Sequence, residues 1–224
     1  MGLFGWFGKR GAATYEADRM WLRRQAALEG LRADLTARLG QDALVLVTAH
    51  FPATFAQVQG MLDSAGLPYG TLEDPITGPQ LAARIEQEAS ARILAAPALA
   101  LLGDAPPAEH VERRRSVSIL AAERHPLRSP DAGIETFAAT VPHPTRVRFY
   151  VSLEDPVLRR FASGWVQTVL TSLGMQEGEA ISSQMVTKRL KQAQQKLEQT
   201  TSRNLPAESA DEWYRLNTRD AIDP

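Results

Sequence analysis

Four short segments with strand character, separated by segments with helical periodicity, occupy the middle of this 224-residue chain. They are ALVLVTAHF (43–51), ARILAAP (91–97), SVSILAAE (116–123) and RVRFYVS (146–152). The first is an apolar run rich in valine and leucine, which is typical of a strand that is buried on both faces. Strands that alternate with helices pair in parallel through crossover connections, so the sequence predicts an α/β fold.

The segments around these strands predict the helices. Residues 52–66 and 79–89 have helical periodicity, and PYGTL (68–72) between them is a short strand candidate. Residues 14–39 are predicted to form one helix that begins at Thr14 and carries an apolar stripe. The arginines on the other faces of this helix are expected to be solvated: Arg19, Arg23, Arg24, Arg32 and Arg38.

The chain is predicted to be helical from Asp155 onward. One helix is expected over 156–173, then a turn over 174–181, then a helix capped by Ser182 or Ser183 that ends near Glu198. In the polar tail that follows, Trp213, Tyr214 and Leu216 form a candidate docking anchor. The expected organisation is an N-terminal segment (1–12), an N-terminal helix (13–40), a sheet domain (42–154), a helical extension (155–200) and a polar tail (201–224).

Composition and motifs exclude several kinds of chemistry. The chain has 25 Lys and Arg against 26 Asp and Glu, so a basic footprint for nucleic acid is absent and no nucleic-acid partner is expected. It has no cysteine, which excludes disulfides and thiol catalysis and fits a cytoplasmic protein. No phosphate-binding P-loop motif or serine nucleophile motif occurs. The histidines lack metal-ligand spacing and are expected in loops or at strand ends: His50, His110, His125 and His143.

The first ten residues, MGLFGWFGKR, combine apolar and basic side chains. They are too short to span a membrane and do not resemble a signal peptide. The pattern favours shallow insertion at a lipid headgroup layer, aided by two positive charges. The alternative is that the aromatic side chains pack on the domain. The residues of the candidate membrane contact are Leu3, Phe4, Trp6, Phe7, Lys9 and Arg10.

Several short sequence motifs in the second half of the chain resemble motifs of the second nucleotide-binding domain of SecA, the motor ATPase of preprotein translocation. They occur in the same order and with the same spacing as in that family. In that family a strand ending in TERH is followed by an arginine-rich helicase motif, RFYLSMED, a helix, LGMKPGEAI and VTK. The matching residues here include Glu123, Arg124, His125, Arg148, Phe149, Tyr150, Glu154, Asp155, Gly174, Gly178, Glu179, Val186, Thr187 and Lys188. The resemblance covers roughly residues 42–198 and implies a RecA-like parallel sheet with flanking helices.

The chain departs from the family at the residues that contact nucleotide. In SecA the motif QLRGRSGRQGD carries arginines that reach the nucleotide phosphates and stabilise the transition state. Read without gaps, its glutamine position falls on Gly133 and its arginine positions fall on Glu135, Phe137 and Thr140. The family's GRGTD motif, expected directly after the strand 91–97, is also replaced, by ALALLGDAP (98–106). The first nucleotide-binding domain, which carries the P-loop, has no counterpart in the sequence. These departures imply no catalytic residues, no cofactor and no metal.

The resemblance therefore implies a non-catalytic, SecA-like pseudo-motor protein, cytoplasmic or peripheral at the inner face of the bacterial membrane. Its expected partners are proteins, with SecA, the translocon or preproteins as candidates, and weak contact with the membrane surface. One alternative is a subunit of a split ATPase, which would bind ATP with a partner that carries the P-loop. Another is a RecA-like module that binds nucleotide or RNA. A further alternative is that the family-like residues persist only because they build the domain.

Overall fold

The computed structural model describes residues 13–41, 44–87, 92–106, 116–161 and 178–218. Its centre is a sheet in which β4 (Gly70–Thr71), β6 (Ile93–Pro97), β3 (Leu44–Ala49), β8 (Val117–Ala121) and β9 (Thr145–Ser152) lie side by side in parallel. The four segments thus form strands, as the sequence predicts. The predicted α/β class, a parallel sheet with flanking helices, is confirmed.

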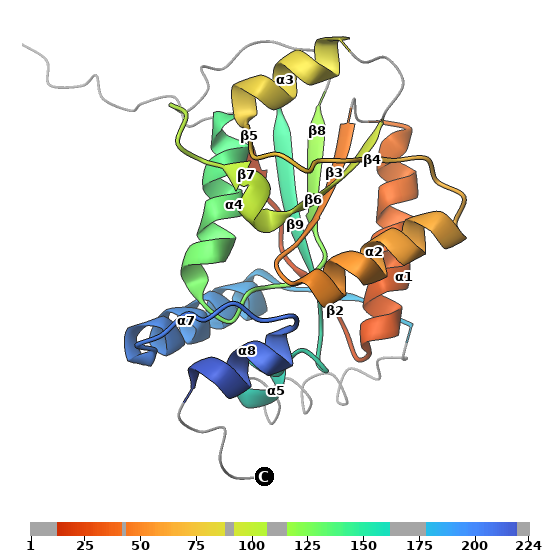
Figure 1. Cartoon of the computed structure of the whole chain (residues 1–224). Coiled ribbons are helices and arrows are strands. Elements are labelled where there is room, and N and C mark those ends of the chain that lie inside the picture. The colour runs from red at the N-terminus through yellow and green to blue at the C-terminus, as the bar shows by residue number, and fades with distance from the viewer. Residues whose placement is uncertain (1–12, 42–43, 88–91, 107–115, 162–177, 219–224) are drawn as a thin grey trace, which may run out of the picture.

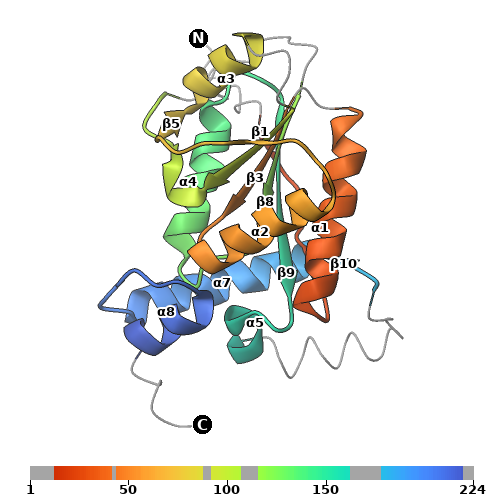
Figure 2. The same ribbon diagram turned by 45° about the vertical axis from the view of Figure 1, so that its right-hand side comes forward.

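Helices cover both faces of this sheet (Figures 1 and 2). The helices α1 (Arg24–Leu39) and α2 (Pro52–Ser64) pack on one face, and α3 (Gly78–Gln87) and α4 (Arg128–Thr140) pack on the other. Each helix buries an apolar stripe against the strands, for example Leu31 and Leu35 of α1, which are both fully buried. A small second sheet joins β5 (Ile76–Thr77) and β7 (Leu101–Leu102), with the 3₁₀ turn η1 (Ala98–Ala100) before β7.

The predicted helix over 14–39 is wrong in its first third, since α1 begins at Arg24. Before it, β1 (Ala13–Tyr15) and β2 (Arg19–Trp21) pair in parallel with successive parts of β9. Thr14 is therefore a strand residue and not a helix cap. The physical reason is a tertiary one: β9 has an open edge, and pairing with it satisfies backbone groups that a longer helix would leave to solvent.

Of the five arginines predicted to be solvated, Arg23 and Arg32 are exposed, whereas Arg19, Arg24 and Arg38 are partly or fully buried. Arg38 is 8% exposed and donates to Ser118 Oγ at 2.6 Å and to Glu16 Oε2 at 2.5 Å. Arg19 donates to Asp34 Oδ1 at 2.8 Å, and the backbone of Arg24 lies at the first turn of α1. Pairing with carboxylates on neighbouring elements allows these side chains to leave solvent.

The C-terminal elements pack at the carboxyl ends of the strands. They are α5 (Pro156–Phe161), β10 (Ile181–Ser182), which pairs antiparallel with β2, then α7 (Gln184–Thr200) and α8 (Ala210–Asn217). Ser183 caps α7 as predicted, with its hydroxyl accepting from Val186 N at 3.5 Å. Most of the helix predicted over 156–173 lies outside the described residues. The tail contains the helix α8, whose Trp213 and Tyr214 are buried, whereas Leu216 is exposed.

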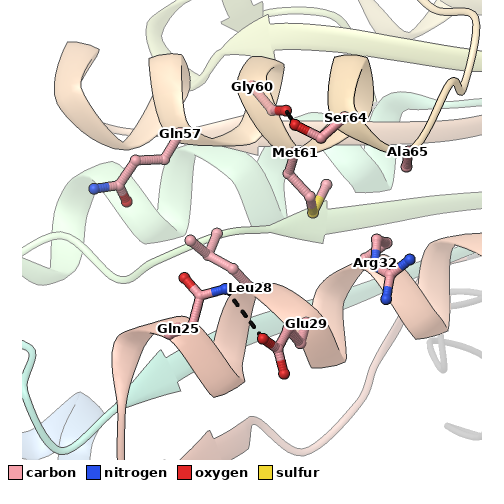
Figure 3. Close-up of a pocket in the computed structure, with 9 residues that line it drawn as sticks. All are labelled: Gln25, Leu28, Glu29, Arg32, Gln57, Gly60, Met61, Ser64 and Ala65. Carbon is pink, nitrogen blue, oxygen red and sulfur yellow. Dashed lines mark hydrogen bonds between the residues drawn. The ribbon is translucent and has the colours of Figure 1, made fainter.

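Two helical glycines predict opposite effects of the same substitution. A Cβ at Gly30 in α1 would overlap the indole ring of Trp21, whereas a Cβ at Gly60 in α2 would meet no atom within 4 Å. Gly60 lines an open groove of about 460 Å³ between α1 and α2 (Figure 3). Gly30→Ala is expected to lower the free energy of unfolding by about 1–3 kcal/mol. Gly60→Ala is expected to raise it by about 0.5–1 kcal/mol, because alanine favours the helix.

Urea unfolding of the two variants measures both effects in one experiment. Each variant is the control for the other, since both changes add one methyl group to a helix interior. A Gly30→Ala protein as stable as the parent would contradict the close packing of Trp21 on α1.

Candidate functional site

The carboxyl ends of β3 and β8 are the place where an open α/β sheet commonly binds its ligand. From β3 the chain crosses by α2 toward β4 and β6, whereas from β8 it crosses by α4 toward β9 on the opposite side. Ligands of such sheets bind outside the carboxyl ends of the strands at this switch point. Here the positions are occupied by His50, directly after β3, and by Glu123, Arg124 and His125 after β8.

Glu123 holds the start of α2. Its Oε1 accepts from the backbone N of His50 at 3.0 Å and of Phe51 at 2.9 Å, and its Oε2 accepts from Thr54 Oγ1 at 2.7 Å. Burial raises the pKa of Glu123, although Arg24 and His50 oppose the shift. A carboxylate that caps a helix N-terminus compensates the helix dipole. The contacts of Glu123 therefore assign it a structural role.

Arg124 joins two carboxylates that are far apart in the sequence. Its Nε and Nη2 donate to Asp18 at 2.7 Å each, and its Nη1 donates to Asp131 Oδ2 at 2.7 Å. Its guanidinium also lies 4.0 Å from the centre of the Phe149 ring. Burial alone would lower the pKa of Arg124, but the two carboxylates raise it above its ordinary value. The geometry is that of a fully paired buried cation.

Asp131, in the first turn of α4, is the centre of this network. Its Oδ1 accepts from His50 Nε2 at 2.8 Å and from the backbone N of His125 at 3.0 Å. Its Oδ2 accepts from Arg124 and from Gln194 Nε2, the latter at 2.6 Å. Burial opposes ionisation, but Arg124 and the other donors hold the pKa of Asp131 well below its usual range. All its lone-pair directions are used, so the carboxylate has no remaining capacity to act as a base.

His125 is held as a neutral ring. Its Nδ1 accepts from the backbone N of Leu127 at 3.0 Å, and the ring stacks on Phe51 and meets Trp213 edge-on at 5.4 Å between centroids. Burial, with His50 nearby, lowers the pKa of His125 to about 3. An ordinary histidine titrates near pH 6.5.

This shift predicts a pH dependence of stability. Between about pH 6.5 and 3 the unfolded chain binds a proton at His125 that the folded chain does not, so the free energy of unfolding falls as the pH falls. The slope from this one group is up to about 1.4 kcal/mol per pH unit, and above pH 6.5 it vanishes. The measurement is the difference in urea unfolding between the parent protein and His125→Gln at a series of pH values.

Taking the difference removes contributions that both proteins share. Burial raises the pKa values of Glu123 and Asp155, so these two groups increase the free energy of unfolding as the pH falls. The pKa of Asp131 is lowered, so this group decreases the free energy of unfolding at still lower pH. Parallel pH profiles for the two proteins would contradict a neutral, buried His125.

The Arg148-Phe149-Tyr150 motif joins β9 to the N-terminal elements. Tyr150 donates its hydroxyl to Asp34 Oδ2 at 2.5 Å, and Arg148 Nη1 donates to the same oxygen at 2.7 Å. The ring of Tyr150 stacks on Trp21 with 5.9 Å between centroids. Burial first, and then Asp34, raises the pKa of Tyr150. The motif thus packs β2 and α1 onto the sheet.

The remaining family-like residues are also mostly structural. Glu154 Oε2 accepts from the backbone N of Arg24 at 2.8 Å, where α1 begins, and Asp155 accepts from Ser152 at the start of α5. Thr187 Oγ1 accepts from Asp18 N at 3.0 Å, which ties α7 to the Arg124 network. Val186 is half-buried, and Gly178, Glu179 and Lys188 are exposed. Gly174 lies outside the described residues.

The positions predicted to correspond to the family's motif arginines do not converge on one surface. Glu135 faces Arg128 and Lys191, with a distance of 2.8 Å to Lys191 Nζ. Phe137 is fully buried in the core between α4 and the sheet, and Thr140 is buried against Gly78. Gly133 lies half-buried on the same helix, α4. Since residues two apart on a helix point to nearly opposite sides, Glu135 and Phe137 cannot contact one ligand.

The C-terminal helices close the switch point from outside. Gln194 of α7 donates to the backbone O of His125 at 2.7 Å, and Trp213 of α8 covers the His125 ring. Figure 1 shows α5, α7 and α8 together at this end of the strands. Beside Glu123 and Arg124 a cavity of only about 20 Å³ remains, which suits about one water molecule.

Sequence reasoning missed the residues that complete this network: Asp18, His50, Asp131 and Gln194. His50 carried one signal, its place directly after a buried strand. The prediction that the histidines lie in loops or at strand ends is confirmed for His50 and His125, but their rings are 5.4 Å apart, a proximity that spacing did not indicate. His110 and the candidate membrane-contact residues of 1–12 lie outside the described residues.

Within the described ranges, no group of three metal-ligating side chains is placed to hold an ion. In the same ranges, no helix has both the length and the apolar character needed to cross a membrane.

Comparison with known proteins places the resemblance in the middle of the chain. Residues 83–178 match the family described as the SecA P-loop domain. The protein translocase subunit SecA of Koribacter versatilis is 41% identical over 90 residues, and that of Xylella fastidiosa is 40% identical over 90 residues. These matches cover 40% of this chain and 9–10% of the relatives, so the matched part spans about a tenth of their length.

Two solved structures resemble the chain more distantly. The C-terminal part of the Fun30 ATPase domain has a TM-score of 0.43 at 12% sequence identity. The match covers 79% of this chain and 54% of the Fun30 chain. The Mss116p DEAD-box helicase domain 2 bound to an RNA duplex has a TM-score of 0.38 at 13% identity, covering 81% and 67%. The expected relationship itself rests on the sequence matches over residues 83–178, and this part of the chain is related to SecA.

Proposed function

We propose that this chain is a non-catalytic, SecA-related accessory module that binds protein partners of the export machinery at the inner face of the bacterial membrane. The observation that carries the proposal is the closed, charge-paired switch point of the sheet. Its ionisable groups are engaged with one another, and α7 and α8 lie over it. A nucleotide there would have to displace both helices and separate Arg124 from two carboxylates.

The arrangement of α4 supports the same proposal. Transition-state stabilisation in phosphoryl transfer needs cations that converge on the transferred phosphate. At the positions in question this chain has a carboxylate paired with Arg128 and Lys191, and two side chains buried in the core. A carboxylate near phosphate would repel it. The retained family-like blocks, by contrast, maintain the packing of the domain, which a binding module also needs.

The first test is nucleotide turnover. The chain alone is expected to release no phosphate from ATP at millimolar concentration, because no set of described residues can both bind the phosphates and stabilise the transition state. A mixture with the host's own SecA is expected to show the turnover of SecA alone. Turnover above that level would contradict the proposal and favour the split ATPase.

The second test identifies the partners. Mild crosslinking of the tagged chain in its host, followed by mass spectrometry, is expected to recover SecA, the translocon or preproteins. Deleting residues 1–10 separates membrane contact from protein contact, since only binding to liposomes should then be lost. Recovery of RNA and its binding proteins instead would favour the alternative of a RecA-like nucleic-acid module.

A further inference from the structure

A further pocket lies between two of the C-terminal helices. It has a volume of about 430 Å³ and is formed by α5 and α8. Three of its lining side chains are arginines and one is a carboxylate. The lining residues are Pro156, Arg159, Arg160, Asp211, Tyr214 and Arg215.

The hydroxyl of Tyr214 is the unusual group of this pocket. The side chain is 5% exposed, and its hydroxyl oxygen is buried without a hydrogen-bond partner. The guanidinium of Arg160 lies 5.2 Å from the centre of the Tyr214 ring. A buried hydroxyl without a partner is unfavourable, whereas a ligand oxygen that accepts from it would remove this penalty. Burial also raises the pKa of Tyr214, so the group is a hydrogen-bond donor throughout the physiological range.

The arginines at the rim of the pocket form exposed ion pairs and can change partners. Arg159 pairs with Asp211, but the two side chains are 54% and 69% exposed. Arg215 pairs with Glu212 on the same helix, and its side chain is 68% exposed. Exposed pairs of this sort contribute little to stability, so either arginine can turn to a stronger anionic partner. Arginine can bind a phosphate through two parallel hydrogen bonds.

We infer that this pocket is a binding site for an oxyanion of the phosphate class. Arg159 and Arg215 bind the oxyanion from the rim, Arg160 places positive charge over the Tyr214 ring, and the Tyr214 hydroxyl donates to one oxygen. The ligand is the phosphate group of a soluble ester or of a lipid headgroup, which present the same chemistry. This inference is independent of the proposed export function.

The test is titration of the whole chain with inorganic phosphate at constant ionic strength, followed by NMR or calorimetry. The expected dissociation constant is on the order of 1 mM, as suits a few charge-assisted hydrogen bonds at a surface. Arg159→Gln is expected to weaken binding about tenfold, and Tyr214→Phe about two- to tenfold. Tyr214→Phe keeps the ring and removes only the unpartnered hydroxyl, so the melting temperature should not fall.

Arg203→Gln is the matched control, because Arg203 is exposed and lies outside the pocket. Binding that is unchanged in Arg159→Gln and Tyr214→Phe, or weakened equally in Arg203→Gln, would overturn the site. The absence of saturable phosphate binding would overturn it as well.

Vesicles distinguish the source of the phosphate. If the ligand is a headgroup, phosphatidylglycerol vesicles should bind the chain, Arg159→Gln should reduce that binding, and phosphatidylcholine vesicles should bind weakly. If vesicles do not bind while inorganic phosphate does, the site takes a soluble phosphate ester. Both results support an oxyanion site, and they differ only in what carries the phosphate.

Discussion

Replacing Asp131 with asparagine is expected to lower the free energy of unfolding by about 3–5 kcal/mol. The four groups around this carboxylate are all donors: the ring of His50, the backbone N of His125, Arg124 and Gln194. An amide of the same size would turn its own NH₂ toward two of them and leave Arg124 with only one anionic partner. Urea unfolding followed by circular dichroism measures the change.

Asp74→Asn is the control for this experiment. Asp74 is exposed in the loop before β5, so the same chemical change there is expected to alter stability by less than about 0.5 kcal/mol. For a chain of this size, the Asp131→Asn loss corresponds to a fall in melting temperature of roughly 6–20 °C. An Asp131→Asn protein within 1 °C of the parent would show that the network is not a determinant of the fold.

Replacing Trp213 with alanine is expected to lower the free energy of unfolding by about 3–5 kcal/mol. The side chain is 1% exposed, its Nε1 donates to Asn204 Oδ1 at 2.7 Å, and its ring packs on His125 and Tyr214. If α8 is an integral part of the domain, the single urea transition moves to lower concentration as a whole. If α8 were an appendage, the main transition would stay in place.

Leu216→Ala provides the comparison for Trp213. Leu216 lies on the same helix but is 39% exposed, so its truncation is expected to cost less than about 1 kcal/mol. A second measurement, hydrogen exchange, reports on the switch point itself. In Trp213→Ala, the amides of His125 and Leu127 are expected to exchange faster, since α8 covers them. Unchanged exchange there would contradict the closing role of α8 that the proposed function depends on.

The sequence predicted the strands well because each of them is a local pattern. The runs that became β3, β6 and β8 are mostly apolar, as burial on both faces of a parallel sheet requires, and β9 is rich in β-branched and aromatic residues. The start of α7 was equally predictable, since Ser183 is a local cap. The short strands β1 and β2 were not predictable in this way. They have no periodicity of their own and exist because β9 offers them backbone partners.

Sequence and tertiary structure also determined different features of the candidate site. The sequence by itself determined the α/β class and the relationship to SecA, because both are properties of residues in order along the chain. Only the tertiary structure decided that these residues form a closed, paired network. Asp18 and Thr187 are 169 residues apart in the sequence, and Asp131 and Gln194 are 63 residues apart. Whether a charge is paired, buried or free to bind depends on neighbours in space, and no local pattern in the chain records which distant segments fold against each other.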